Sequence, residues 1–231
     1  MEMGGRVQKA SGLFRPLWLA IPASLLLLPG MVHAQVPTLQ HRGDEADKVI
    51  VQKDFVSGGE VDLKVNSGDV RIVRNHEPEQ IRVEIHLQTK GFDTSLAVQK
   101  WIRAFEVQGN HASILLQLPG SKTVGLTTLY LPEITSIAVD LHAGKLVVRG
   151  VKGSKNLHVG SGNLTLREAD PATYASVKAE VGLGQLSDWV FHGKEGGTLG
   201  REMEAQGPGK YQLYMHLGIG DLQITQEDGS F

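Results

Sequence analysis

The chain has 231 residues, 23 of them Lys or Arg and 25 Asp or Glu, so its formal net charge is −2 at pH 7. It contains 28 glycines and no cysteine. The length allows one domain or two small ones. The lack of a basic excess argues against a nucleic-acid partner, and the lack of cysteine excludes disulfide frameworks, iron–sulfur clusters and thiol catalysis.

Residues 1–34 have the pattern of a secretory signal peptide. Basic residues precede an apolar run over residues 16–28, and a Pro-Gly break and small residues lead to Ala34. The run is about a dozen residues long, whereas a membrane-spanning helix needs roughly 20. We therefore expect cleavage near Ala34, with an uncleaved N-terminal anchor as the alternative. The exported chain, without a membrane span, would then reside in the periplasm, at the cell surface or outside the cell.

Residues 35–47 are polar without periodicity and indicate a flexible leader. From Lys48 onward apolar and polar residues alternate, as in Val61–Val65 and Ile81–Ile85. A period of two is typical of strands with one buried side. The sequence therefore predicts a single all-β domain over residues 48–226.

A short repeat recurs within this domain: an apolar residue, two or three small or turn-prone residues, a glycine, a polar residue and an apolar residue. The glycines that align the five copies are Gly68, Gly144, Gly162, Gly184 and Gly220. Their separations of 76, 18, 22 and 36 residues correspond to four, one, one and two units of about 18–22 residues. The pattern predicts a β-solenoid, similar to a β-helix, in which each strand bends at its glycine. An antiparallel sandwich of glycine-turn hairpins is the alternative.

Two segments interrupt the repeat. Apolar residues between 93 and 105, including Trp101 and Phe105, fall on one helical stripe and predict a short helix that covers an edge of the stack. Residues 191–210 are rich in Gly and Pro and predict an irregular insertion.

The repeats Val61–Ile72, Asn156–Leu166 and Tyr211–Ile224 resemble the bacterial putative-adhesin family. These are exported β-strand-repeat proteins of unknown function, and the likeness covers roughly residues 50–224. The resemblance implies a solenoid-like domain in the cell envelope, with no catalytic residues to transfer.

No motif for catalysis or cofactor binding is found. The Gly-x-Gly segments at 160–162, 182–184 and 218–220 lack the third glycine of the dinucleotide fingerprint, and no nucleophile elbow is present. We therefore expect no catalytic residue and no cofactor.

One set of polar residues recurs four positions before each repeat glycine: Lys64, Asp140, His158, Glu180 and His216. If successive repeats lie side by side, Asp140, His158 and Glu180 form an outward column. A divalent metal or a pH-responsive site is one interpretation. The favoured interpretation is a solvated ladder of alternating charge, because side chains on a convex face do not converge on a metal.

The function that these features favour is a non-catalytic envelope protein that contacts another protein or a glycan. Sparse aromatic residues, Trp189, Tyr211 and Tyr214, would form a platform for a sugar or cover strand edges. One alternative is a β-helical carbohydrate-active enzyme, whose carboxylate pair would come from the set Asp62, Asp69, Asp140 and Glu180. The other is an accessory protein of an envelope-stress signalling system. The pattern favours no particular oligomeric state.

Overall fold

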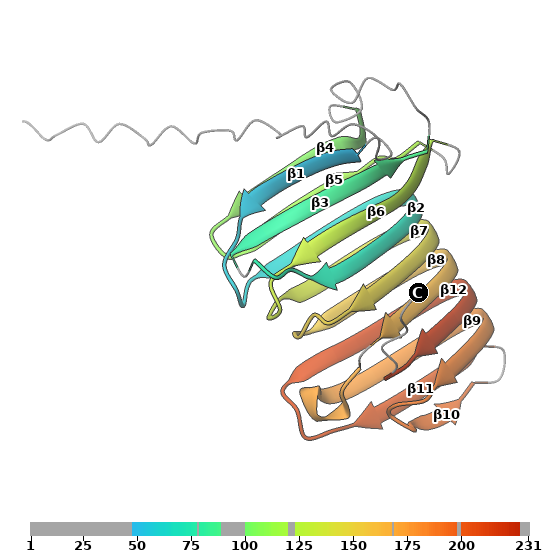
Figure 1. Cartoon of the computed structure of the whole chain (residues 1–231). Coiled ribbons are helices and arrows are strands. Elements are labelled where there is room, and N and C mark those ends of the chain that lie inside the picture. The colour runs from blue at the N-terminus through green and yellow to red at the C-terminus, as the bar shows by residue number, and fades with distance from the viewer. Residues whose placement is uncertain are drawn as a thin grey trace, which may run out of the picture. The chain divides into compact units, whose positions relative to one another are not determined.

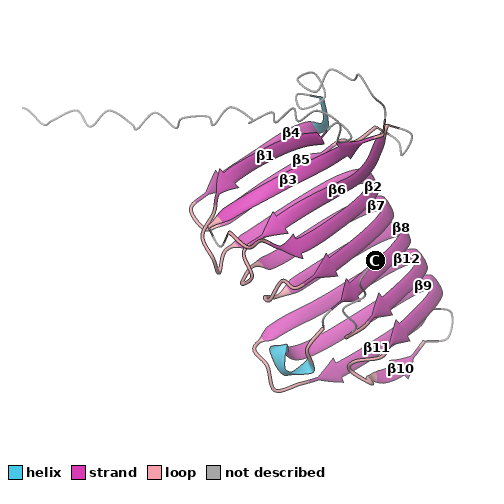
Figure 2. Cartoon of the chain, in the orientation of Figure 1, coloured by secondary structure: helices cyan, strands magenta, loops and turns pink. Residues whose placement is uncertain are grey.

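The computed structural model describes residues 48–77, 79–88, 100–119, 123–167, 169–197 and 200–226, all within the unit Gln35–Phe231. These residues form one open, mixed sheet of 12 strands and a single turn of 3₁₀ helix, η1 (Pro171–Thr173) (Figures 1 and 2). The strands are β1 (Lys48–Asp54), β2 (Glu60–Arg74), β3 (Gln80–Leu87), β4 (Ile102–Gln108), β5 (His111–Leu116), β6 (Val124–Leu131), β7 (Ser136–Arg149), β8 (Lys155–Arg167), β9 (Tyr174–Asp188), β10 (Lys194–Gly196), β11 (Arg201–Gln206) and β12 (Tyr211–Ile224). The predicted all-β class is confirmed.

Five long strands form the centre of the sheet in the order β2-β7-β8-β12-β9, all parallel and in register. Their repeat glycines lie side by side and have φ values between +127° and +141°. Only glycine adopts such values without strain. Each strand bends at this row of glycines, so the halves before and after the bend belong to two layers (Figure 1).

The shorter strands extend these two layers at their ends. Before the glycine, β5 and β4 continue the first layer beyond β2, and β11 and β10 continue it beyond β9. After the glycine, β6, β3 and β1 continue the second layer beyond β2. The strands added beyond β6, β5 and β9 pair antiparallel, which makes the sheet mixed.

Alternation of side chains places one core between the layers. In β7, Val139 and Leu141 before the glycine and Leu146 and Val148 after it are all buried. The corresponding residues of β2, β8 and β12 belong to the same hydrophobic cluster. Because their inward side chains are fixed by this packing, the outward residues have fixed positions on the two outer faces.

The order of the strands differs from the order expected from the separations between the repeat glycines. The 18-residue step from Gly144 to Gly162 joins neighbouring strands, as predicted. Gly68 is also a direct neighbour of Gly144, although 76 residues separate them, because the chain forms β3 to β6 in between. Gly162 and Gly184 are not neighbours, since β12 lies between β8 and β9. A solenoid that runs through the whole domain is therefore not confirmed, and the parallel pairing also differs from an antiparallel sandwich.

The predicted helix over 93–105 is wrong where the structure describes it. Lys100 and Trp101 are helical, but Ile102–Gln108 is strand β4, paired with β5 through a hairpin at Gly109. Pairing satisfies the backbone groups of both strands and buries Phe105. Residues 89–99 lie outside the described residues.

The segment 191–210 is also more regular than predicted, since it contains β10 and β11. The predicted signal peptide over 1–34 and leader over 35–47 lie outside the described residues. Within the ranges that are described, no helix is long and apolar enough to cross a membrane.

Candidate functional site

The outer face of the first layer carries the row of polar residues four positions before the repeat glycines. Register places them on neighbouring strands in the order Lys64, Asp140, His158, His216 and Glu180, and Glu202 of the antiparallel strand β11 lies next to Glu180. We call these six residues the polar column. Neighbouring strands of a sheet are about 4.8 Å apart, so adjacent members of the column lie side by side. The column thus crosses six strands of one layer.

The structure corrects the membership of the expected column. Asp140 and His158 are neighbours, as the sequence indicates, but His216 of β12 separates His158 from Glu180. The histidine predicted between two carboxylates is thus a pair of histidines with one carboxylate on each side.

Each histidine is oriented by its own carboxylate. Nδ1 of His158 lies 3.3 Å from Oδ1 of Asp140, and Nδ1 of His216 lies 3.3 Å from Oε2 of Glu180. The two ring centroids are 5.0 Å apart. A neutral ring that donates its Nδ1 proton to a carboxylate keeps Nε2 as a hydrogen-bond acceptor. In that tautomer, each ring of the pair offers its Nε2 to a donor.

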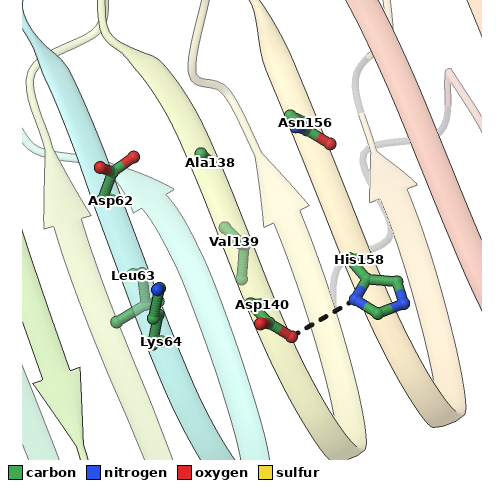
Figure 3. Close-up of a pocket in the computed structure, with 8 residues that line it drawn as sticks. All are labelled: Asp62, Leu63, Lys64, Ala138, Val139, Asp140, Asn156 and His158. Carbon is green, nitrogen blue, oxygen red and sulfur yellow. Dashed lines mark hydrogen bonds and ion pairs between the residues drawn. The ribbon is translucent and has the colours of Figure 1, made fainter.

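A second row, two residues earlier in each strand, adds a pocket. In this row Ala138 lies between Asp62 and Asn156. Its small side chain leaves a hollow of about 290 Å³, which we call the Ala138 pocket; its polar lining comes from Asp62, Lys64, Asp140, Asn156 and His158 (Figure 3).

The pocket is part of a longer hollowed surface. A neighbouring hollow of about 430 Å³ shares Lys64 and Asp140 with it and reaches Arg103 and Gln117 at the β4–β5 hairpin. Arg103 donates to the Gln117 side chain at 2.9 Å, which positions both groups. The two hollows together are suited to an extended ligand rather than a single ion.

The other end of the column is a network of ion pairs around Lys178. Its Nζ lies 2.9 Å from Glu180, 2.9 Å from Glu202 and 3.5 Å from Glu204. Hydrogen bonds to Glu180 and Glu202 raise the pKa of Lys178. Hydrogen bonding from Lys178 lowers the pKa of Glu180, although partial burial acts in the opposite direction. Glu180 therefore stays ionised and continues to orient His216.

Tyr214 completes this end of the face. Its hydroxyl donates to Oε2 of Glu180 at 2.9 Å, and partial burial, followed by the bond to Glu180, raises its pKa. The residue is 36% exposed, so part of the ring is open to a ligand.

The remaining sequence-predicted residues are not gathered here. Trp189 follows the end of β9, beyond the glycine, whereas Tyr211 and Tyr214 precede the glycine of β12, so the three do not form one platform. Of the four nominated carboxylates, Asp62 and Asp140 line the same pocket, Glu180 lies further along the column, and Asp69 lies beyond the glycine of β2. Among the residues that are described, no group of three or more His, Asp or Glu side chains is placed to hold a metal ion.

Sequence reasoning missed the Ala138 pocket. The signal was present, because the same alignment on the glycines places Asp62, Ala138 and Asn156 in one row. A small residue between two hydrogen-bonding residues on neighbouring strands predicts a hollow with polar walls.

No protein-family model and no curated protein matches the chain. Three solved structures are similar to it. A putative cell adhesion protein from Clostridium sporogenes has 16% identity and a TM-score of 0.48, and the match covers 78% of this chain and 100% of that one. A putative adhesin from Parabacteroides distasonis has 11% identity and a TM-score of 0.30, and the match covers 78% of this chain and 71% of that one. A putative adhesin from Bacteroides fragilis has 8% identity and a TM-score of 0.26, with 77% of this chain and 96% of that one covered.

Two of these proteins are named putative adhesins and the third a putative cell adhesion protein, names that agree with the family that the repeats resemble.

Proposed function

We propose that this chain is a non-catalytic exported protein of the cell envelope, adhesin-like in role, which binds a glycan on the outer face of its first layer. Its scaffold is a solenoid-like stack of five bent strands. The observation that carries the proposal is the Ala138 pocket, in which two carboxylates, an amide, an ammonium and an imidazole surround a small floor.

The chemistry of the pocket is that of sugar recognition. Sugar hydroxyls both donate and accept hydrogen bonds, and the lining of Asp62, Asp140 and Asn156 supplies acceptors and a donor with planar geometry. The exposed part of the Tyr214 ring offers an apolar surface for the C–H groups of a sugar. The strands fix these side chains before the ligand arrives, which lowers the entropic cost of binding.

The binding experiment compares two double variants of the chain from residue 35 onward on an array of bacterial and host glycans. We expect Asp140→Asn/Asn156→Ala to weaken binding at least tenfold. The matched control, Asp221→Asn/Asn163→Ala, changes the same residue types on neighbouring strands of the other layer and should leave binding within twofold. Failure of the unmodified chain to bind any glycan, or an equal loss in both variants, would overturn the proposal.

The same glycans test the enzymatic alternative, which the placement of Asp62 and Asp140 around one pocket favours over the other nominated pairs. A glycoside hydrolase needs two carboxylates on either side of the scissile bond. Release of new reducing ends by the unmodified chain, lost in Asp62→Asn, would replace the binding proposal with a hydrolase.

Export is tested separately. The proposal expects the secreted form to begin close to Gln35, because the apolar run and small residues of 1–34 are typical of a cleaved signal. Intact-mass measurement of the protein recovered from the periplasm of an expressing bacterium locates the cleavage. Retention of the full chain in the cytoplasm would overturn the envelope location.

A further inference from the structure

The outer face of the second layer has a groove of about 520 Å³ that the proposed function does not use. We call it the basic groove, because four of its lining residues are cationic: Arg71, Lys145, Arg149 and Arg167. Among the described residues that line it, Asp69 is the one carboxylate. The chain as a whole has a net charge of −2, so this gathering of cations is a local feature.

Strand register defines how the cations are arranged. Val147 of β7 lies next to Arg71 of β2, and Arg149 of β7 lies next to Arg167 of β8. Lys145 and Arg149 are four residues apart on one strand, which is about 13 Å. The cations therefore surround Val147 on several sides instead of forming a single line.

The floor of the groove is apolar. It includes Val73, Val147 and Leu126, and Gly125 adds no side chain on β6. The ends of Arg71 and Lys145 extend into solvent, since both residues are exposed. A ligand in the groove would thus contact an apolar surface beneath and positive charge around it.

A hollow lined by four cations and one carboxylate concentrates the positive potential and attracts anions. It therefore favours a ligand that carries more than one negative charge.

We propose that the basic groove binds an acidic oligosaccharide whose sugar rings carry carboxylate groups. Guanidinium groups bind carboxylates through two parallel hydrogen bonds, and the apolar floor is suited to the C–H faces of sugar rings. The volume is within the range of small-molecule sites, about 300–1,000 Å³, and is far larger than a single inorganic anion needs.

A membrane surface is a poorer occupant. Binding to lipid headgroups is strengthened by apolar side chains that insert between them. None of the large exposed apolar residues in the described part of the chain lines this groove; they are Val56, Leu115, Ile134, Leu183, Trp189, Tyr214 and Ile219.

The test is calorimetric titration of the chain from residue 35 onward with tetragalacturonate at 50 mM and 200 mM NaCl. We expect binding that weakens several-fold at the higher salt, because the contacts are ionic. Arg71→Ala/Lys145→Ala should weaken binding at least tenfold at 50 mM. Lys194→Ala/Arg201→Ala removes the same charge from exposed positions on β10 and β11 and should remain within twofold of the unmodified chain.

Three further ligands separate the sources of negative charge. Maltotetraose, a neutral oligomer of equal length, should not bind at this groove. Inorganic phosphate that binds as tightly as tetragalacturonate, or phosphatidylglycerol vesicles that capture the chain through Arg71 and Lys145, would overturn the assignment. Absence of tetragalacturonate binding, or an equal loss in the control variant, would also overturn it.

The outcome is independent of the proposal for the first layer. Asp140→Asn/Asn156→Ala should still bind tetragalacturonate with unchanged affinity. Circular dichroism of each variant confirms that the fold is retained, which we expect because Arg71 and Lys145 are exposed.

Discussion

At the scale of single residues, the row of glycines sets how closely the five long strands approach one another. A Cβ atom built on Gly162 would meet the carbonyl oxygen of Gly144, and one built on Gly220 would meet the carbonyl oxygen of Gly162. Gly68, at the end of the row, has the same type of backbone conformation, but among the described residues its added Cβ would meet Cδ1 of Leu118 alone, at 3.4 Å. Glycine is needed in this row for its positive φ and for the close approach of neighbouring backbones, and substitutions can separate these two reasons.

Gly68→Ala should destabilise the protein by about 1–3 kcal/mol, the typical cost of a non-glycine residue in a glycine-only backbone conformation. Gly162→Ala adds a backbone collision to the same conformational cost and should lose at least about 2 kcal/mol more. Urea denaturation of both variants gives the two values. Equal losses would mean that the close approach of the strands does not contribute.

Lys155 is the residue that departs most from the pattern of the core. It occupies the inward row that holds Ile137 in β7 and Leu213 in β12, and it is only 3% exposed. Its Nζ donates to the Tyr174 hydroxyl at 2.6 Å and to the Gly153 carbonyl at 3.1 Å. Burial lowers the pKa of Lys155 from 10.5 to about 7.

This shift makes stability depend on pH. Between pH 7 and 10.5 the unfolded chain binds more protons at Lys155 than the folded chain does, so the free energy of unfolding rises with pH in that window. The slope approaches about 1.4 kcal/mol per pH unit. Below pH 7 the penalty is complete and no longer changes. We expect the rise between pH 7 and 9 in urea titrations of the unmodified protein.

Lys155→Met should abolish this rise, while Lys194→Met, which changes an exposed lysine, should preserve it. The range stops at pH 9 because the unfolded chain begins to lose tyrosine protons near pH 10, whereas burial raises the pKa of Tyr174 in the folded state. A slope that survives in Lys155→Met would assign the pH dependence to another group.

At the scale of elements, the position of β12 between β8 and β9 determines which side chains become neighbours. The absence of native cysteine makes this order directly testable. Asn163 of β8 and Asp221 of β12 are paired in register, and both are exposed. Gln185 of β9 pairs with Asp221 from the other side.

Asn163→Cys/Asp221→Cys should form a disulfide on mild oxidation, because neighbouring strands are about 4.8 Å apart and disulfides join Cα atoms about 4.4–6.8 Å apart. Asn163→Cys/Gln185→Cys should keep two free thiols, since the intervening strand doubles the separation to about 9.6 Å. Thiol titration after oxidation distinguishes the pairs. The reverse result would restore the order in which β9 follows β8.

The same elements show what sequence patterns determine and what they leave open. The glycine alignment predicted the bends and the outward direction of the residues four positions before each glycine, such as Asp140, His158 and Glu180, because both depend on local conformation and a period of two. It did not predict strand order, since the repeat of β12 fits beside β8 as well as the repeat of β9 does. The Ala138 pocket depends on β2, β7 and β8 being neighbours and on a small side chain between two polar ones, a signal that the alignment contained and that was not used.

The helix predicted over 93–105 failed for a related reason. Trp101, Ile102 and Phe105 fit a helical stripe, but Phe105 and Val107 also fit the alternation of a strand. Pairing of β4 with β5 decided between the two patterns. The pattern of a short apolar segment fits a helix and a strand equally well, so pairing with a neighbouring strand determines which of the two forms.

At the scale of the whole described domain, one core supports two outer faces of different chemistry. The first layer carries the polar column and the Ala138 pocket, and the second layer carries the basic groove. The buried residues of both layers form a single cluster between these faces. The faces share strands β2, β7 and β8 but no lining side chain.

Two faces separated by a close-packed core should bind independently. Free-energy changes at sites more than about 7–10 Å apart without shared partners add to within roughly 0.5 kcal/mol. The combined variant Asp140→Asn/Asn156→Ala/Arg71→Ala/Lys145→Ala should therefore lose glycan binding and tetragalacturonate binding each to the same extent as the corresponding double variant. Calorimetry with each ligand, alone and after saturation with the other, measures the coupling. A second ligand that binds more than about threefold more tightly or weakly to the saturated protein would show that the core transmits strain from one layer to the other.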